Sequence, residues 1–261
     1  MSLVSWAVPI AAQWMPKLSS RVLASSGYTR DVDAFGDGAF EVWNEATAER
    51  QDRAWRPLVA EALERGRPRA DIEALRSALH ACGDTLESVL EVGCGGGYLS
   101  ELVDAWYPDS RYVGIDISEA MIANARRHFP GRDFRTASAY DLPFDDDEME
   151  LVLDGVALIH MPDWKRALAE YARVAKGRIV LHGLTLTDEA ATTRFGKYAY
   201  GQPTLEFVFG RTEFEQTCEQ LGLVRELSLP GLEYDLRRYI GIPSVSESWV
   251  LHVEAPARDA S

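Results

Sequence analysis

The sequence has few cysteines and no long hydrophobic run. Its three cysteines, Cys82, Cys94 and Cys218, are far apart and show neither a C-x-x-C pair nor a metal-ligand spacing. Such usage is typical of a reducing compartment, so we expect a cytoplasmic protein without a bound metal. No segment reaches the roughly 18 consecutive apolar residues that a membrane-spanning helix needs. The first ten residues lack the basic start and cleavage site of a signal peptide, so we do not expect one there.

Basic residues are also scarce relative to acidic ones. The chain has 27 Lys and Arg against 41 Asp and Glu, which gives a formal net charge of -14. A field of this sign repels phosphate backbones and anionic lipid surfaces, so we expect neither nucleic acid nor membrane as a partner. A cationic cofactor or an amine would be tolerated. With 46% hydrophobic residues in 261, the chain can form one large domain with a smaller cap.

Short apolar strands alternate with amphipathic helices along the middle of the chain. We expect five such strands at Ser88–Val92, Tyr112–Ile115, Asp133–Thr136, Glu150–Leu153 and Arg178–Leu181. Two further strands, at Val224–Leu229 and Ser248–Val253, can pair as a terminal hairpin. This alternation predicts a Rossmann-like, doubly wound α/β fold: a mostly parallel, seven-stranded sheet with an antiparallel last strand, plus N-terminal helices.

The chain is expected to divide into a cap and a core. We expect residues 1–83 to form a helical lid or cap and residues 84–261 to form the core, with an acceptor-side insert at about 184–211. Within the cap, apolar spacing predicts one helix with Pro57 in its first turn and Gly66 at its end, and a second from Ala70 to Cys82. A further helix is expected to begin at Thr212, capped reciprocally with Glu215.

A glycine-rich loop follows the first strand of the sheet. Gly93, Gly95 and Gly97 stand between that strand and a helix, where a ligand can approach the backbone without meeting a Cβ atom. Asp116 ends the next strand about 20 residues on, where a carboxylate can accept both ribose hydroxyls. Together these features indicate a cofactor that contains adenosine.

The spacing of the loop separates two kinds of cofactor. Dinucleotide sites carry G-x-G-x-x-G, whereas this chain has G-x-G-x-G at residues 93–97. Glu91, two residues before the first glycine, is unusual for a site that must hold a pyrophosphate. A carboxylate there suits a ligand that carries an ammonium or sulfonium charge.

Four motifs occur in order along the chain. The first three are Val89–Gly97, Val113–Met121 and Ala137–Phe144, and the fourth has two parts, Met149–Val152 and Leu158–Asp163. They resemble the motifs of class I S-adenosylmethionine-dependent methyltransferases, especially the small-molecule group that includes ubiquinone and menaquinone C-methyltransferases, and the resemblance covers roughly residues 86–183. The chain departs from the family at Ser138, where an aspartate usually binds the adenine amino group, and a hydroxyl accepts that hydrogen bond more weakly.

The resemblance implies a set of residues that bind S-adenosyl-L-methionine. Glu91, Gly93 and the carbonyl of Asp154 are expected at its methionine end, and Asp116 at its ribose. Ile117 and Met121 are expected to enclose the adenine, although both are equally typical of ordinary core. The full expected set is Glu91, Gly93, Cys94, Gly95, Asp116, Ile117, Met121, Ser138, Ala139, Tyr140 and Asp154.

Methyl transfer depends mainly on aligning the acceptor and excluding water, and an oxygen or nitrogen acceptor also needs a base. The candidate bases are His160 and His182. In the alternative interpretation, His160 is a histidine at a helix start that bonds to Asp163, and His182 has a structural role. For the acceptor we expect Tyr28 and Trp43 from the N-terminal segment. The insert contributes Tyr198 and Tyr200 to the same pocket, unless its aromatic residues form a lid or the interface of a homodimer.

Three other functions remain open on the sequence. An NAD(P)-dependent oxidoreductase would require the dinucleotide spacing, and no Tyr-x-x-x-Lys motif is present. A protein that binds S-adenosylmethionine without turnover is compatible with every residue above. An RNA methyltransferase is disfavoured by the acidity and by Asp154-Gly155-Val156-Ala157, which stand where an Asn-Pro-Pro-Tyr-like motif would be. The acceptor atom (oxygen, nitrogen or carbon) is left undetermined.

Overall fold

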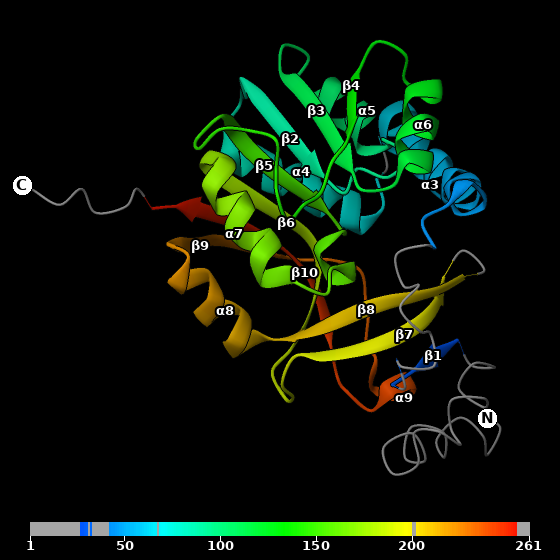
Figure 1. Ribbon diagram of the computed structural model, residues 1–261, viewed down its shortest axis with the longest axis vertical. Helices are drawn as coiled ribbons and strands as arrows, with labels where there is room; N and C mark the ends of the chain where they lie inside the picture. Colours follow the sequence, from blue (N-terminus) through cyan, green and yellow to red (C-terminus); the bar gives the residue numbers. More distant parts are fainter. Residues whose placement is uncertain (1–26, 31, 33–41, 67, 200–201, 255–261) are drawn as a thin grey trace, which may run out of the picture.

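The computed structural model describes residues 27–30, 32, 42–66, 68–199 and 202–254, with the side chains of residues 198, 199, 202 and 203 left aside. A seven-stranded sheet runs through the centre of the molecule (Figure 1). Its strands, in spatial order, are β4 (Asp133–Thr136), β3 (Arg111–Asp116), β2 (Ser88–Val92), β5 (Met149–Gly155), β6 (Ala175–Thr187), β10 (Val245–Val253) and β9 (Leu223–Pro230).

The strand directions confirm the predicted fold class. Strands β4, β3, β2, β5 and β6 are parallel, and β10 lies antiparallel between β6 and β9. The order of the central strands reverses beside β2, the first strand of the sheet along the chain. In open α/β sheets the crevice at this switch point, outside the carboxyl ends of the strands, is where ligands bind.

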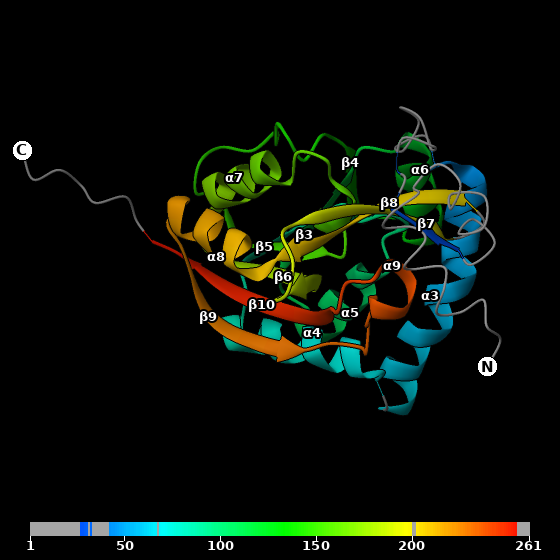
Figure 2. The ribbon, with the colours of Figure 1, turned by 90° about the horizontal axis from the view of Figure 1, so that it is seen from below.

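Helices cover both faces of the sheet (Figure 2). Successive residues of a strand point to opposite faces, so Leu90 of β2 packs with one buried cluster and Val89 with the other. The first cluster includes residues of α7 (Trp164–Val174) and α8 (Arg211–Gln220). The second includes residues of α4 (Ala70–Cys82), α5 (Leu99–Trp106) and α6 (Glu119–His128). The central strands β2 and β5 are therefore buried on both sides, as their continuous apolar sequences predict, whereas the edge strands β4 and β9 are more exposed.

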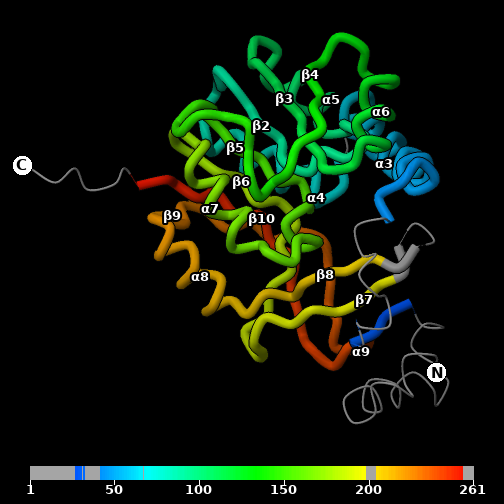
Figure 3. Tube along the Cα trace, viewed as in Figure 1, coloured from blue at the N-terminus to red at the C-terminus, as the bar shows by residue number. Residues whose placement is uncertain are grey.

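Three more strands extend the sheet beyond the end of β6. In this extension β8 (Gln202–Gly210) pairs in parallel with the last residues of β6, then β7 (Thr193–Ala199) and the short β1 (Tyr28–Thr29) follow in antiparallel pairing. The extension occupies the position of the insert predicted at about 184–211. Its residues Phe195 and Phe209 are fully buried in hydrophobic clusters, so these two aromatic side chains serve packing. Figure 3 shows the chain leaving the core along β6 and returning along β8.

Two helix starts differ from the sequence-based expectation. Helix α3 (Glu45–Arg65) begins ten residues before Trp55, because the side chain of Asn44 caps it by accepting a hydrogen bond from Thr47 N at 3.2 Å. Pro57 therefore lies inside α3 and not in its first turn, whereas Gly66 ends it as predicted, in the left-handed conformation.

The expected capping box of Thr212 and Glu215 is wrong. Helix α8 begins at Arg211, directly after β8, and its N-cap residue Gly210 has no side chain to contribute. Glu215 instead forms an ion pair with Arg225 of β9 at 2.7 Å. The expected helical material before residue 39 lies outside the described residues, apart from β1 and its neighbours. Within the described part of the chain, no helix combines the length and the apolar character needed to span a bilayer.

Candidate functional site

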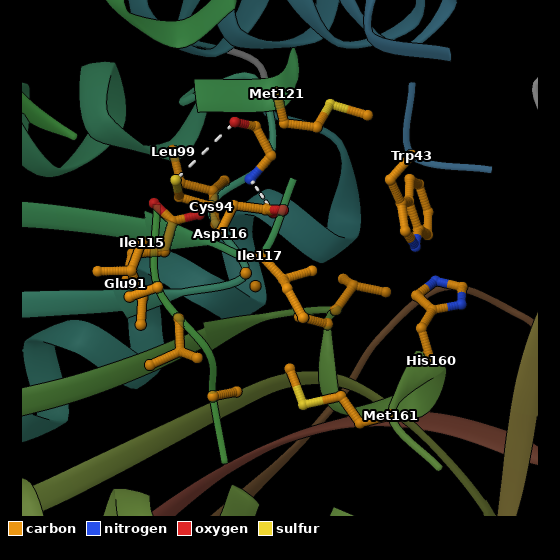
Figure 4. A pocket seen from close by; sticks show the side chains of 18 of the residues that line it. Trp43, Glu91, Cys94, Leu99, Ile115, Asp116, Ile117, Met121, His160 and Met161 are labelled. Carbon is orange, nitrogen blue, oxygen red and sulfur yellow. Dashed lines mark hydrogen bonds between the residues drawn. The ribbon is translucent and has the colours of Figure 1, made fainter. Parts of the chain in front are cut away.

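A cavity opens at the carboxyl ends of β2, β3 and β5, beneath helix α3. It contains all of the predicted cofactor residues except Asp154, together with both candidate histidines. Figure 4 shows Glu91, Cys94 and Asp116 toward one end and Trp43 with His160 at the other. The lining residues that the argument uses are Trp43, Gln51, Trp55, Glu91, Gly93, Cys94, Gly95, Asp116, Ile117, Met121, Ser138, Ala139, Tyr140, Val156, His160, Met161 and His182.

The glycine loop requires glycine for its conformation and for space. Gly93, Gly95 and Gly97 all have positive φ, at 71°, 52° and 80°. A Cβ atom on Gly93 would lie 2.2 Å from the Cβ of Ala157, so no other residue fits without a shift of the backbone. Cys94 N donates to the carbonyl of Ile115 at 2.8 Å, which ties the loop to the neighbouring strand β3. The loop therefore presents bare backbone to the cavity.

Asp116 lies at the end of β3 with its carboxylate fixed in place. Its Oδ2 accepts from Gly95 N at 2.9 Å and its Oδ1 from Ser118 N at 2.8 Å. Burial raises the pKa of Asp116, and these two hydrogen bonds oppose the rise by favouring the carboxylate. Each oxygen retains acceptor capacity, so a pair of vicinal hydroxyls can bind here.

Glu91 is a buried acid inside the cavity. Its residue is 2% exposed, and the hydroxyl of Tyr112 donates to its Oε2. Burial raises the pKa of Glu91 to about 8, and the negative charges of Asp154 and Asp116 add to the rise, while the Tyr112 hydrogen bond opposes it. Without a ligand, Glu91 is therefore mostly protonated at neutral pH. A cation beside it would favour the ionised form.

Asp154 is the predicted cofactor residue that does not line the cavity. Its Oδ1 accepts from Ala157 N at 2.8 Å and Leu158 N at 3.1 Å, and its Oδ2 accepts from the Tyr171 hydroxyl at 2.8 Å. The side chain thus shapes the turn after β5. In this turn Val156 has φ of 75°, an uncommon conformation for a β-branched residue, and its side chain lines the cavity.

The apolar part of the cavity lies next to Asp116. Ile117 is 55% exposed although it is a large hydrophobic residue, while Met121 beside it is buried. Ser138, Ala139 and Tyr140 belong to the same cavity, and Ser138 Oγ accepts from Tyr140 N at 3.2 Å. An exposed isoleucine among these residues provides an apolar surface on which a flat ring can stack.

His160 ends the short 3-10 helix η2 (Leu158–His160) and faces Trp43, with ring centroids 5.1 Å apart in an edge-to-face arrangement. Its Nδ1 lies 2.7 Å from the carbonyl oxygen of Leu205 in β8. A carbonyl only accepts, so Nδ1 carries the proton and Nε2 keeps its lone pair. Burial lowers the pKa of His160, which keeps the ring neutral. The sequence had suggested Asp163 as a hydrogen-bond partner of His160, but Nδ1 bonds to Leu205 instead.

His182 has a different environment. It is 3% exposed, and its Nδ1 lies 2.8 Å from Ser248 Oγ of β10. Burial lowers its pKa to about 4, so the imidazole has little affinity for a proton at neutral pH. Although it lines the cavity, these contacts favour the structural alternative for His182 over the catalytic one.

The predicted acceptor residues are not all brought together. Trp43 lines the cavity. Tyr28 is not among the lining residues: it lies in β1 and stacks on Tyr239 with ring centroids 4.4 Å apart. The side chain of Tyr198 and the whole of Tyr200 fall outside the described residues, so their placement stays a prediction.

Sequence reasoning missed the contribution of helix α3 to this site. Gln51 and Trp55, four residues apart on one face of α3, line the cavity above the glycine loop. The sequence pattern began this helix near Trp55, so it left Gln51 outside the helix and did not reveal which face would cover the loop. Among the described residues, no group of three or more His, Cys, Asp or Glu side chains is placed to hold a metal ion.

Comparisons with known proteins give a consistent picture. A family model described as a methyltransferase domain matches residues 90–181. A phthiotriol/phenolphthiotriol dimycocerosates methyltransferase of Mycobacterium tuberculosis is 41% identical over 93 residues, which are 34% of each chain. A ubiquinone/menaquinone biosynthesis C-methyltransferase of Desulfotalea psychrophila is 30% identical over 158 residues, 59% of this chain and 56% of the relative. The chain thus spans between a third and three fifths of these relatives' lengths.

Solved structures share the fold at low sequence identity. Magnesium protoporphyrin IX methyltransferase from Synechocystis, solved with bound S-adenosylmethionine, superposes with a TM-score of 0.57 at 15% identity. The match covers 82% of this chain and 94% of that one. At this identity the likeness shows the fold alone, and the chemistry must be argued from the residues of the cavity.

Proposed function

We propose that this chain, whose residues 90–181 match a methyltransferase domain, transfers the methyl group of S-adenosylmethionine to a small molecule. The family match confirms the resemblance that the sequence motifs indicated. The observation that carries the proposal is the pairing of a bare-backbone loop at residues 93–97 with two acids, the buried Glu91 and the half-buried Asp116. The loop presents its backbone to the cavity, and the two acids suit a ligand with ribose hydroxyls and positive charge.

The cofactor can be placed by the chemistry of each part of the cavity. Asp116 accepts hydrogen bonds from the ribose hydroxyls, and Ile117, Met121 and Ala139 enclose the adenine, with Ser138 near its amino group. Glu91 and the backbone of Gly93 and Gly95 hold the methionine ammonium. Asp154 acts through the turn it stabilises, and Cys94 serves as part of the loop.

The acceptor occupies the end of the cavity near Trp43, Met161 and His160. Its apolar and aromatic lining favours a molecule with an apolar portion. His160 presents Nε2 as the proton acceptor when the attacking atom carries hydrogen. The reaction is a displacement in which the acceptor's electron pair forms a bond to the methyl carbon while the bond from carbon to sulfur breaks. S-adenosylhomocysteine leaves, and His160 takes the proton of an O–H or N–H acceptor.

Two alternatives are tested by the same measurements. An oxidoreductase must bind NAD(P), whose pyrophosphate would face Glu91 in this cavity. A protein without turnover would bind S-adenosylhomocysteine but release no methyl group. The cytoplasmic location, the homodimer, the lack of nucleic-acid partners, and the division into a cap at 1–83 and a core at 84–261 stay predictions from the sequence.

The function is tested in two steps. First, isothermal titration compares S-adenosylhomocysteine with NAD on the full chain, and we expect binding of the former alone. Then S-adenosylmethionine labelled in its methyl group is incubated with phenols, alcohols, carboxylic acids and amines, and label transferred to the acceptors is counted. Binding of NAD without S-adenosylhomocysteine contradicts the proposal, and binding without transfer to any class favours the protein without turnover.

A further inference from the structure

The side-chain amide oxygen of Gln51, Oε1, is buried and has no partner among the described residues. Gln51 lines the cavity from helix α3, above the glycine loop, and a Cβ on Gly95 would lie 3.0 Å from Oε1. A buried amide oxygen that lacks a partner is costly, so such an atom in a ligand cavity indicates that the ligand supplies the partner.

Helix α3 is fixed where it crosses the loop. The hydroxyl of Tyr98, just after the loop, donates to Asp52 Oδ1 at 3.1 Å. Ser118 Oγ, which caps α6, also donates to the carbonyl of Trp43 just before α3. These contacts lie on both sides of Gln51 along the chain. The amide is therefore held over Gly95 by its neighbours and does not depend on its own hydrogen bonds for this position.

The charges of the cavity decide which part of the cofactor reaches Gln51. Glu91 and Asp116 repel a carboxylate, so the carboxylate of the methionine part must point away from both. It then requires a hydrogen-bond donor from an element other than the strand ends that carry these two acids. Gln51 lies above Gly95 on helix α3, and rotating its amide by half a turn exchanges Oε1 and Nε2 without moving any other atom.

We propose that Gln51 binds the α-carboxylate of the cofactor's methionine part through its amide N–H group. The inference rests on the proposed function, because it assumes that S-adenosylmethionine occupies the cavity. It assigns to α3 the recognition of the amino-acid end of the cofactor. The ribose remains with Asp116 and the ammonium with Glu91.

The test compares two ligands on one variant. S-adenosylhomocysteine contains the amino-acid part, whereas 5′-methylthioadenosine contains the same nucleoside and sulfur but neither the carboxylate nor the ammonium. Gln51→Glu separates these two groups, because a carboxylate at residue 51 would repel the ligand's carboxylate but attract its ammonium. Gln51→Met keeps the length and the helix propensity of the side chain and removes its donor. Gln216→Met, on the exposed face of α8, is the matched control. Binding is measured by isothermal titration, and far-UV circular dichroism melting checks that each variant is folded.

We expect Gln51→Met to weaken S-adenosylhomocysteine roughly 10- to 100-fold, the loss typical of a hydrogen bond to a charged group. Binding of 5′-methylthioadenosine should stay within about twofold, and Gln216→Met should change neither ligand. Gln51→Glu should weaken S-adenosylhomocysteine further, because it places a like charge beside the carboxylate.

Equal losses for both ligands, or no loss for S-adenosylhomocysteine, overturn the assignment of Gln51. If the unchanged chain fails to bind S-adenosylhomocysteine at all, the proposed function itself fails. The two failures are therefore distinguishable in the same experiment.

Discussion

The buried carboxyl of Glu91 makes cofactor binding depend on pH. Its pKa is about 8 in the cavity, and the ligand's ammonium group requires the ionised form. Each pH unit below this pKa makes the ionised form roughly tenfold less populated. The affinity for S-adenosylhomocysteine should therefore rise about tenfold from pH 6 to pH 7, a range in which the ligand's amino group stays protonated.

Isothermal titration in two buffers of different ionisation enthalpy measures this effect. At pH 7 we expect close to one proton released per S-adenosylhomocysteine bound, so the apparent binding enthalpy should differ between phosphate and Tris. Glu91→Gln cannot ionise, and its binding should be weaker at pH 7 and nearly independent of pH. An affinity that is equal at pH 6 and 7 in the unchanged chain, with no proton released, would refute the role of Glu91 as partner of the ammonium.

Three further predictions concern other parts of the structure. Gly97→Ala should lower the free energy of unfolding by about 1–3 kcal/mol in urea denaturation, because Gly97 has a positive φ and a Cβ there would lie 2.6 Å from Phe134 Cζ. The control Gly131→Ala, at a glycine with positive φ but open space around it, should lower the free energy of unfolding less. Nitrogen-15 NMR should find His160 neutral at pH 7 with its proton on Nδ1, and a proton on Nε2 would contradict the contact with Leu205. Although burial opposes ionisation of Glu247, hydrogen bonds from Arg211, Trp249 and Ser228 hold its pKa at about 2, against a usual 4.5. The ionised Glu247 should therefore stabilise the fold fully above pH 4.5 and progressively less toward pH 2. The difference in unfolding free energy between the unchanged chain and Glu247→Gln should narrow over that range, and a constant difference would contradict the prediction.

The parallel core could be predicted because its signals are local. Strand β2 and its glycine loop are recognisable in the sequence as an apolar run followed by residues that tolerate positive φ. The boundaries of β4 match the prediction, and those of β3 extend it by one residue at each end. Strands β2 and β3 are buried on both faces, so apolar runs and turn residues are sufficient to locate them, whereas the edge strand β4 has a single buried residue, Phe134.

The extension and the cover of the site could not be predicted in the same way. Strands β7 and β8 pair over long sequence separations with the end of β6 and with β1, and their aromatic residues suit a pocket as well as a core. Helix α3 begins with a polar first half, from Glu45 to Arg53, that carries no apolar stripe. Its start is set by the cap at Asn44, and the face that covers the loop is set by tertiary contacts such as that of Asp52 with Tyr98.

The histidines show how far sequence alone separates a base from a structural residue. In the sequence, His160 follows the fourth predicted strand and His182 the fifth, so both were candidates, although β6 in the structure continues past His182. The structure distinguishes them by their partners: a carbonyl fixes the tautomer of His160, and deep burial suppresses protonation of His182. Neither the partner nor the burial of a side chain is visible in a strand-end pattern.

A crystal structure of the chain with S-adenosylhomocysteine tests the central claim most directly. We expect the nucleoside over residues 93–97, with its ribose hydroxyls on Asp116 and its ammonium near Glu91. A cavity that stays empty at saturating ligand, or a ligand bound elsewhere on the chain, would contradict the account.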